Sequence, residues 1–389
     1  MKIVVLGGAG MMGCIAVKDL SRSTAVDQVV IADLDVERAK EVAALIGSPK
    51  VNVAQADATD EASLLKVMEG ADCLLNATVY YFNLQVMEAC LKAQVHYIDL
   101  GGLWHVTRQQ QKLDERFKEA GITAVLGMGS APGVPNVQGR YIADRLDSME
   151  YIHIYDGIKP PPGDDIRLGY AIPTIIDEIT MKPMIYRDGQ FVACEPLSEM
   201  EDYWFTPPVG LLRCHLSLHS ETATLPLTFA HKGVQECFFK INFWGMSEAA
   251  LRKVKLLGDL GFASKEPIEV AGGRVAPRDV LIKMLAPYTP PISAFLDWPE
   301  PSEDWTKEIV TEVKGTRGGK TVVYRLGTLT NFGSLPTGVG PSVVAQWLAG
   351  GRIEQTGVLP PEVAIEPEPF FRELEERGIK TQVTVTEPV

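Results

Sequence analysis

The first third of the chain alternates short apolar runs with segments in which apolar residues recur every three or four positions. The short runs predict buried strands, and the longer period predicts helices with one apolar face. Since strands and helices alternate strictly, we expect parallel strands joined by right-handed helical crossovers. The expected strands cover residues 3–6, 29–32, 51–54, 73–77, 97–100 and 122–126. Three expected helices cover residues 13–20, 83–93 and 107–120, and two more begin after the capping residues Asp35 and Asp60.

Beyond residue 127 the strict alternation ends and turn signals become frequent. The pairs Asp188-Gly189 and Gly318-Gly319 predict hairpins over residues 185–193 and 314–325. We therefore expect a second domain, over residues 129–332, of α+β type with a mostly antiparallel sheet. Further expected elements are helices over residues 135–146 and 341–348, strands over residues 151–155 and 237–244, and a proline-rich loop over residues 159–163.

The length and composition support two domains and narrow the class of partner. A chain of 389 residues with 46% hydrophobic content exceeds the size at which single cores usually stop growing. The net charge of −13 argues against nucleic acid and against an anionic membrane surface as partners. No run of roughly 18 apolar residues predicts a membrane span, and glycines break the apolar run at the N-terminus, which argues against a signal peptide.

The six cysteines are scattered, without a Cys-x-x-Cys pair or a metal-ligand spacing. Such sparse use in a large chain predicts reduced, mostly buried thiols, a cytoplasmic setting and no metal site. Cys14 comes directly after a glycine motif, and we expect it to pack in the first helix.

Gly8, Gly10 and Gly13 form a Gly-x-Gly-x-x-Gly motif between the first expected strand and the first expected helix. The first glycine permits a tight turn, the second lets the backbone approach a pyrophosphate, and the third lets the helix pack on the strand. Free N–H groups at the helix start, at Met11 and Met12, would bind the phosphates. The motif predicts a Rossmann dinucleotide-binding domain with a doubly wound sheet over residues 1–128. The alternative is a glycine turn in an ordinary α/β domain.

Asp33 ends the second expected strand, 20 residues after Gly13, where a carboxylate can accept hydrogen bonds from the adenosine ribose. Because the same carboxylate would repel a 2′-phosphate, Asp33 favours NAD over NADP as the cofactor. Arg38 is close enough in sequence to complicate this preference, or it lies on a solvated helix face. Asp57 follows the third strand and could contact adenine or form a turn.

The fourth and fifth expected strands both end in polar residues. In a doubly wound sheet these two ends border the crevice in which a nicotinamide would lie. Asp99, at the end of the fifth strand, could contact a substrate ammonium or move a proton there, or it could cap a turn. We expect Asn76 and Ala77 to contact the cofactor, and Tyr80, Asn83, Gly101 and Gly102 to contact the substrate.

Several longer motifs resemble the saccharopine dehydrogenase family, which includes lysine 6-dehydrogenases and carboxynorspermidine-forming enzymes. They are NATVYYFN at residues 76–83, HYIDLGG at 96–102, GMGSAPGVPN at 127–136, HSETATLP at 219–226, VAPRDVL at 275–281, LPTGVGPSVVAQWL at 335–348 and TGVLPPE at 356–362. The resemblance covers nearly the whole chain. It implies a first domain completed by about residues 333–389, a substrate domain in between, and a homodimer.

The resemblance also implies the reaction, an oxidation or reduction at the CH–NH group of an amino-acid substrate of the saccharopine or lysine type. Hydride passes between nicotinamide and the amine-bearing carbon, and the resulting imine is hydrolysed. A base must first deprotonate the ammonium, and Asp99, Tyr81 and His219 are the candidates, with His215 as an alternative to His219. Further residues expected near the substrate are Pro132, Gly133, Asn136 and Glu221, with Arg213 or Arg140 as a carboxylate clamp.

Two other classes of function remain open on the sequence. One is a sensor or scaffold that binds NAD(H) without turnover. The other is a hydroxy-acid or aldehyde dehydrogenase on the same fold, although none of the six cysteines has the setting of a covalent nucleophile.

Overall fold

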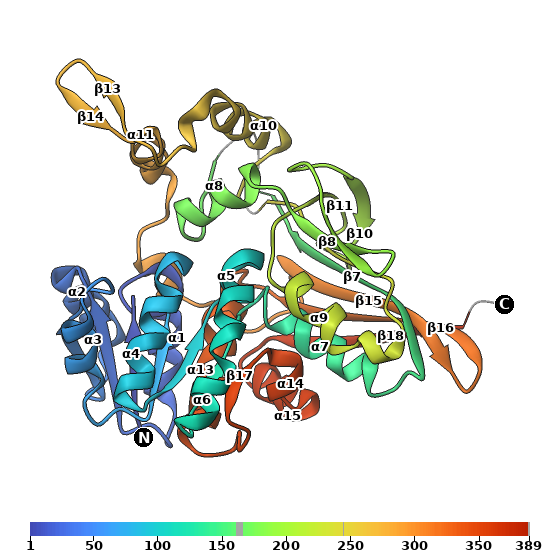
Figure 1. The fold of residues 1–389 in the computed structure, drawn as a ribbon, viewed down its shortest axis with the longest axis horizontal. Helices are drawn as coiled ribbons and strands as arrows, with labels where there is room; N and C mark the ends of the chain where they lie inside the picture. The colour runs from blue at the N-terminus through green and yellow to red at the C-terminus, as the bar shows by residue number, and fades with distance from the viewer. Residues whose placement is uncertain (161–165, 244, 388–389) are drawn as a thin grey trace.

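A computed structural model describes residues 1–160, 166–243 and 245–387 of the chain and arranges them around two large sheets (Figure 1). The first sheet has seven parallel strands in the order β17-β6-β5-β4-β1-β2-β3. In β1, Ile3 and Val5 face one core while Val4 and Leu6 face another, because successive side chains of a strand point to opposite faces. Its strands are β1 Lys2–Leu6, β2 Gln28–Asp33, β3 Val51–Gln55, β4 Cys73–Asn76, β5 His96–Asp99, β6 Thr123–Val125 and β17 Gly357–Leu359.

Helices cover both faces of this sheet, which confirms the expected doubly wound arrangement. The expected caps are present, since Asp35 accepts a hydrogen bond from the Arg38 amide at 3.0 Å and Asp60 accepts one from the Ala62 amide at 3.0 Å. The single helix expected over residues 107–120 is wrong, because a 3₁₀ turn at Gln111–Leu113 divides it. The helices are α1 Met11–Arg22, α2 Val36–Ile46, α3 Glu61–Met68, α4 Asn83–Ala93, α5 Leu103–Gln110 and α6 Asp114–Glu119.

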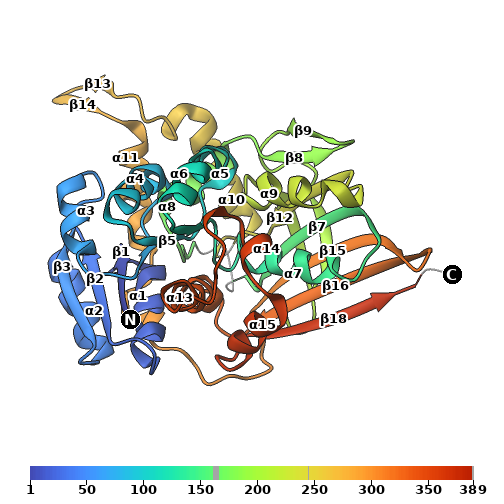
Figure 2. The same ribbon diagram turned by 60° about the horizontal axis from the view of Figure 1, so that its bottom comes forward.

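The C-terminal part of the chain returns to the first sheet and then leaves it again (Figure 2). Helix α13 Leu335–Ala349 packs against α1, and β17 pairs in parallel with β6. The last strand departs from the expected completion over residues 333–389. Strand β18 Lys380–Thr386 pairs with β16 at the edge of the second sheet, where its apolar residues Val383 and Val385 stay exposed.

The second sheet is mixed and mostly antiparallel, as expected, with β12 and β7 as its parallel pair. Both expected hairpins are present, and Asp188 and Gly189 adopt the positive φ that a two-residue hairpin turn requires. The strands are β7 Ser148–Ile158, β8 Met184–Arg187, β9 Gln190–Ala193, β10 Glu201–Trp204, β11 Leu211–Leu216, β12 Glu236–Ile241, β15 Lys307–Arg317 and β16 Lys320–Thr330, and a separate hairpin pairs β13 Ile268–Val270 with β14 Gly273–Val275. The remaining helices are α7 Val134–Ala143, α8 Ile172–Thr180, α9 Glu221–Thr228, α10 Glu248–Leu257, α11 Pro277–Leu285, α12 Ser293–Leu296, α14 Pro361–Ala364 and α15 Pro367–Glu375.

Two expected elements extend beyond what the structure describes. Trp244, the end of the strand expected over residues 237–244, and residues 161–163 of the proline-rich loop lie outside the described residues. Within the described ranges, no helix combines the length and the apolar character needed to cross a membrane.

Candidate active site

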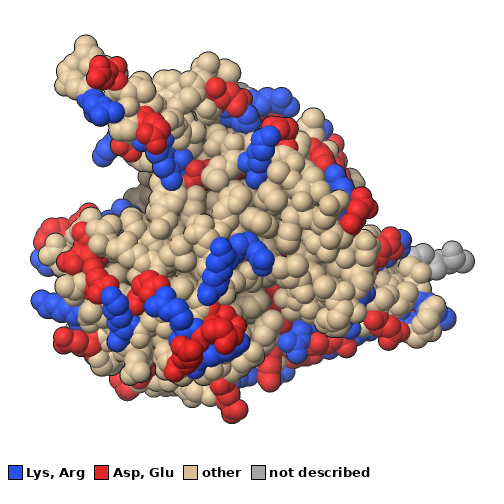
Figure 3. All heavy atoms as spheres, viewed as in Figure 1, with Lys and Arg blue, Asp and Glu red and all other residues tan. Residues whose placement is uncertain are grey.

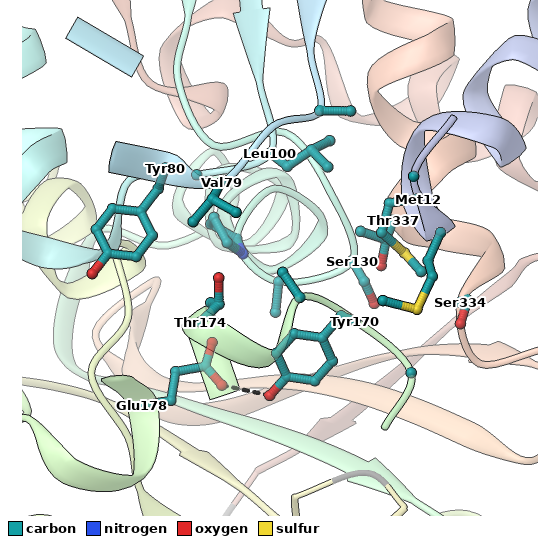
Figure 4. A pocket seen from close by; sticks show the side chains of 18 of the residues that line it. Met12, Val79, Tyr80, Leu100, Ser130, Tyr170, Thr174, Glu178, Ser334 and Thr337 are labelled. Carbon is teal, nitrogen blue, oxygen red and sulfur yellow. Dashed lines mark hydrogen bonds between the residues drawn. The ribbon is translucent and has the colours of Figure 1, made fainter. Parts of the chain in front are cut away.

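A cavity of about 470 Å³ lies between the two domains and joins the glycine turn to the second sheet. Figure 3 shows the molecule hollowed between the part that carries α2 and α3 and the part that carries α11, β13 and β14. Figure 4 shows Met12, Ser334 and Thr337 at one end of the cavity, which we call the glycine end. Tyr80 and Glu178 lie at the other end, which we call the carboxylate end.

The glycine turn is open, as binding of a pyrophosphate requires. A Cβ at residue 13 would lie 2.3 Å from the Gly7 carbonyl oxygen, so only glycine lets α1 begin this close to the turn. No side chain caps the first turn of α1, which leaves its N–H groups to a ligand. These features fit a nucleotide cofactor. Of the residues expected at the cofactor, Gly10, Met11, Met12, Asp33 and Ala77 line the cavity, whereas Gly8, Gly13, Asp57 and Asn76 do not.

Asp33 connects the end of β2 to the glycine turn. Its Oδ2 accepts a hydrogen bond from the Ala9 amide at 3.0 Å, and its Oδ1 accepts one from the Asp35 amide at 3.1 Å. Arg38 lines the same part of the cavity, so a cation and an anion both border the expected ribose position. Asp57 accepts hydrogen bonds from the amide and hydroxyl of Thr59 at 2.8 and 2.7 Å. It therefore forms a turn, which was the alternative to a contact with adenine.

Asp99 is buried and lies outside the cavity lining. Burial raises the pKa of Asp99, and the hydrogen bonds that it accepts oppose that rise. With this many donors, the carboxylate holds the loops after β4, β5 and β6 together, and the structure does not bring it to the cavity. The five donors are the side chains of Asn83, Tyr97 and Gln110 and the amides of Gly101 and Gly127, at 2.6 to 3.0 Å.

Tyr80 and Tyr81 both contact the carboxylate of Asp177 on α8. Tyr80 lines the cavity and donates its hydroxyl to Asp177 Oδ2 at 2.8 Å. Tyr81 lies outside the lining, donates to the same oxygen, and accepts a hydrogen bond from Arg278 Nη2 at 2.5 Å. Burial raises the pKa of Tyr81, so its hydroxyl keeps its proton near neutral pH and does not act as a base. Its position outside the cavity lining also argues against that role.

His219 is buried beside the carboxylate end, stacks on Phe239, and lines the cavity. Its Nδ1 lies 2.9 Å from Glu221 Oε2, and its Nε2 lies 3.6 Å from Glu178 Oε1. Burial lowers the pKa of His219, but the two carboxylates outweigh burial and raise the pKa to about 10. His219 is therefore an imidazolium near neutral pH, and it can donate a proton or a hydrogen bond.

Asp156, Glu178 and Lys307 also line the cavity, and the sequence analysis missed all three. Lys307 Nζ lies 2.9 Å from Asp156 Oδ2, and both side chains are buried. Tyr170 donates its hydroxyl to Glu178 Oε2 at 2.5 Å (Figure 4). Burial raises the pKa of Asp156, and Lys307 opposes that rise.

A signal for these residues was present in the sequence. Asp156 interrupts the largely apolar second half of strand β7, and Glu178 lies among the four isoleucines of helix α8. A charged residue inside an apolar element is buried only when it is paired or functional. The pairing of β7 with β15, which brings Lys307 next to Asp156, joins segments about 150 residues apart and has no local signal.

The remaining expected substrate residues fall into two groups. Gly101 and Pro132 line the cavity with Tyr80, whereas Asn83, Gly102, Gly133, Asn136, Arg213 and Glu221 do not. Neither candidate clamp for a carboxylate is there: Arg213 pairs with Asp202 at 2.8 Å on the exposed face of β11, and Arg140 pairs with Asp144 at 2.8 Å. His215 also lies outside the lining and contacts Glu248 at 2.6 Å.

A parallel sheet whose glycine turn opens into a cavity shared with a second domain defines the class of two-domain, nucleotide-dependent oxidoreductases. Residues 3–125 match the family model described as the saccharopine dehydrogenase NADP binding domain. Residues 129–379 match the model described as the saccharopine dehydrogenase C-terminal domain. The chain therefore belongs to the saccharopine dehydrogenase family, as its motifs predict.

Two curated relatives carry names from polyamine chemistry. The chain is 26% identical over 418 residues to carboxyaminopropylagmatine dehydrogenase of Synechocystis sp. (strain ATCC 27184 / PCC 6803 / Kazusa), covering 100% of this chain and 98% of that protein. It is 26% identical over 308 residues to carboxynorspermidine synthase of Vibrio cholerae, covering 73% and 72%. Neither name supports the expected saccharopine or lysine substrate.

The fold has a close counterpart among solved structures. Apo saccharopine dehydrogenase (L-Glu forming) from Saccharomyces cerevisiae superposes with a TM-score of 0.68 at 17% identity, over 99% of both chains. The family match supports a nucleotide cofactor, and the choice between NAD and NADP depends on residues such as Asp33 and Arg38.

Proposed function

We propose that this protein is an NAD(P)-dependent oxidoreductase acting on the CH–NH group that joins an amino acid to a polyamine-type amine. The observation that carries the proposal is the cavity between the two domains, which has an open glycine turn at one end and buried ionisable groups at the other. The names of the two relatives support the substrate class.

A bound nicotinamide cofactor would accept or supply the hydride. In the oxidative direction, the substrate carbon loses a hydride and its nitrogen loses a proton, which gives an imine that water converts into a carbonyl compound and an amine. Near the carboxylate end, the imidazolium of His219 can donate a proton or hydrogen bond, and Glu178 offers an oxygen that faces the cavity (Figure 4). Leu100 and the apolar part of Met12 help to exclude water.

We also propose NAD as the preferred cofactor, because Asp33 places a carboxylate at the end of β2. The test is a turnover assay of the purified protein with NAD and NADP, which follows the absorbance of the reduced nicotinamide. The substrates are carboxyaminopropylagmatine, carboxynorspermidine, saccharopine and lysine. We expect turnover of one of the first two; turnover of saccharopine or lysine alone would contradict the substrate class.

A lack of turnover on the whole panel, with cofactor binding intact, would favour the sensor or scaffold alternative. Cofactor binding is then measured separately by the shift in unfolding temperature that NAD produces.

A further inference from the structure

Two helices begin side by side at the glycine end of the cavity. Because α1 follows β1 and α13 leads into β17 of the same parallel sheet, the two helices run in the same direction. They touch where Gly338 meets Ile15, and a Cβ at residue 338 would lie 2.5 Å from the Ile15 Cβ. Each contact residue comes about one turn after its helix begins, at Met11 and at Leu335. The positive ends of two helix dipoles therefore border one part of the cavity, which favours an anion there.

The start of α13 offers hydroxyl groups where α1 offers free N–H groups. Pro336 has no N–H, and the amides of Leu335 and Thr337 donate to the carbonyl oxygens of Phe332 and Ser334. A serine at a helix start commonly accepts a hydrogen bond from the first turn, but the Ser334 side chain makes no such bond. Ser334 and Thr337 both line the cavity, so their hydroxyls are placed to donate to a ligand.

Ser130 adds a third hydroxyl, from the loop after β6. The residue is 3% exposed, and its Oγ has no hydrogen-bond partner among the described residues. Ser130 lines the cavity, and Figure 4 shows it at the glycine end with Met12 and Thr337. The preceding Gly129 lies against Thr337, since a Cβ at residue 129 would be 3.6 Å from Thr337 Cγ2. Because buried hydroxyls in folded proteins are nearly always hydrogen-bonded, an unpartnered one that lines a cavity points to a ligand.

The pyrophosphate of a dinucleotide brings two negative charges to the glycine end. In the described part of the cavity lining, the basic side chains are Arg38, His219 and Lys307. His219 and Lys307 face carboxylates, and Arg38 borders the expected ribose. Most of the charge of the pyrophosphate must therefore be met by helix dipoles and by uncharged donors such as hydroxyls.

We propose that Ser130, Ser334 and Thr337 bind the pyrophosphate of the dinucleotide, together with the free N–H groups at the start of α1. Hydroxyls that donate to a phosphate form charge-assisted hydrogen bonds. All three residues lie beyond residue 125, where the match to the NADP binding domain model ends, so part of the cofactor site comes from the remainder of the chain. The inference goes beyond the proposed function, because it concerns cofactor binding and holds for any substrate.

The first experiment measures binding without turnover. Calorimetry compares NAD with ADP-ribose, which keeps the pyrophosphate and lacks the nicotinamide, in wild type, Ser334→Ala and Thr337→Val. We expect each variant to bind both ligands about tenfold more weakly, which corresponds to about 1.4 kcal/mol, because each loses a hydrogen bond to phosphate. A loss for NAD alone would place the hydroxyls at the nicotinamide half and overturn the proposal. Unchanged affinity for both ligands would also overturn it.

The matched control is Thr174→Val, which has the same change of side chain as Thr337→Val. Thr174 lines the same cavity from α8, and Figure 4 shows it on the side of Glu178. We expect this variant to bind ADP-ribose as tightly as the wild type does. A loss equal to that of Thr337→Val would show that any missing hydroxyl disturbs the cavity, and would overturn the proposal.

Ser130→Ala separates a binding role from a structural one. Without cofactor, its free energy of unfolding should stay unchanged or rise, because the substitution removes a buried hydroxyl that has no partner among the described residues. ADP-ribose should bind this variant about tenfold more weakly. A loss of stability without cofactor, or full affinity for ADP-ribose, would overturn the role of Ser130.

Turnover distinguishes this inference from the proposed function. If the wild type turns over none of the amine substrates while the three variants lose affinity for ADP-ribose, the proposed function fails and the pyrophosphate site stands. If an amine is turned over while all three variants bind ADP-ribose like the wild type, the pyrophosphate site fails and the proposed function stands.

Discussion

Asp33 and Arg38 carry opposite charges at the glycine end of the cavity, where the adenosine ribose of a dinucleotide is expected. Asp33 is held by the amides of Ala9 and Asp35, so its carboxylate is fixed in place. A fixed carboxylate accepts hydrogen bonds from a ribose and repels a phosphate on it. Arg38 would favour the phosphate, so the balance of these two side chains sets the preference.

The substitution Asp33→Ser should shift cofactor preference toward NADP. Removing the carboxylate removes the repulsion, while Arg38 remains to pair with a 2′-phosphate. We expect the ratio of kcat/KM for NADP to that for NAD to rise by about tenfold or more, or about 1.4 kcal/mol. Asp57→Ser is the matched control, because Asp57 lies outside the cavity lining and bonds to its own turn. An unchanged ratio in Asp33→Ser would contradict the role of Asp33.

His219 makes the stability of the fold depend on pH. Its pKa is about 10 in the folded chain and about 6.5 in an unfolded one, so the folded state binds the proton more tightly. The stabilisation is fully present below about pH 6.5 and is lost as the pH rises toward about 10.

The measurement is the free energy of unfolding of wild type and His219→Gln across that pH range. The difference between the two proteins should be largest below pH 6.5 and shrink steadily toward pH 10. A difference that stays constant, or grows, would show that Glu221 and Glu178 do not hold His219 as an imidazolium.

At the scale of elements, the first domain could be predicted from the sequence because its signals are local. Apolar runs, caps such as Asp35 and Asp60, and the glycine motif all lie within a few residues of the structure they determine. The interruption between α5 and α6 escaped prediction because Asp114 begins α6 while its side chain accepts a hydrogen bond from Val358, far along the chain. Local periodicity carries no trace of such a contact.

The residues of the candidate site also divide into those that a local motif predicts and those that only the tertiary structure brings to the cavity. Gly10, Met11, Met12 and Asp33 line the cavity where the motif places them. Local motifs could not place Asp156, Glu178 and Lys307 at the cavity, because β7, α8 and β15 come together only in the tertiary structure. Asp99 illustrates the opposite error, since the end of a parallel strand is also where buried carboxylates hold loops together.

Arg278 on α11 ties that helix to α8 and to the residues after β4. It pairs with Asp177 through Nη1 and Nη2, each at 2.8 Å, and it also contacts Tyr81. Because both charged side chains are buried, Arg278→Met leaves Asp177 without its counter-charge. We expect the free energy of unfolding to fall by about 3–5 kcal/mol.

Arg213→Met is the control for this prediction. Arg213 forms an equally short pair with Asp202, but both side chains are exposed, so the expected loss is about 0.2–1 kcal/mol. Turnover of Arg213→Met should match the wild type, because Arg213 lies outside the cavity lining. Comparable losses of stability in the two variants by denaturant titration would contradict the role assigned to burial.

At the scale of the whole molecule, the chain passes between the two sheets more than once. It builds six strands of the first sheet, crosses to the second, returns with α13 and β17, and ends in the second sheet with β18 (Figure 2). Side-chain hydrogen bonds hold the returning segment against the first domain, since Arg377 and Ser342 both donate to the carboxylate of Asp19 on α1. Buried Glu362 accepts a hydrogen bond from Asn136 on α7 at 2.8 Å.

This interlocked path predicts that the two domains unfold together. Unfolding of the first sheet must release α13 and β17, which lie between β16 and β18 in the chain, so it also removes an edge strand from the second sheet. We expect one calorimetric transition, with calorimetric and van't Hoff enthalpies in agreement. In single-tryptophan variants, the fluorescence of Trp347 in α13 and that of Trp305 beside the second sheet should give the same unfolding midpoint. Cofactor at about a hundredfold excess over its Kd should stabilise that one transition by about 2.7 kcal/mol. Two transitions, of which cofactor moves only the first, would show that the domains are independent and that the returning segment does not couple them.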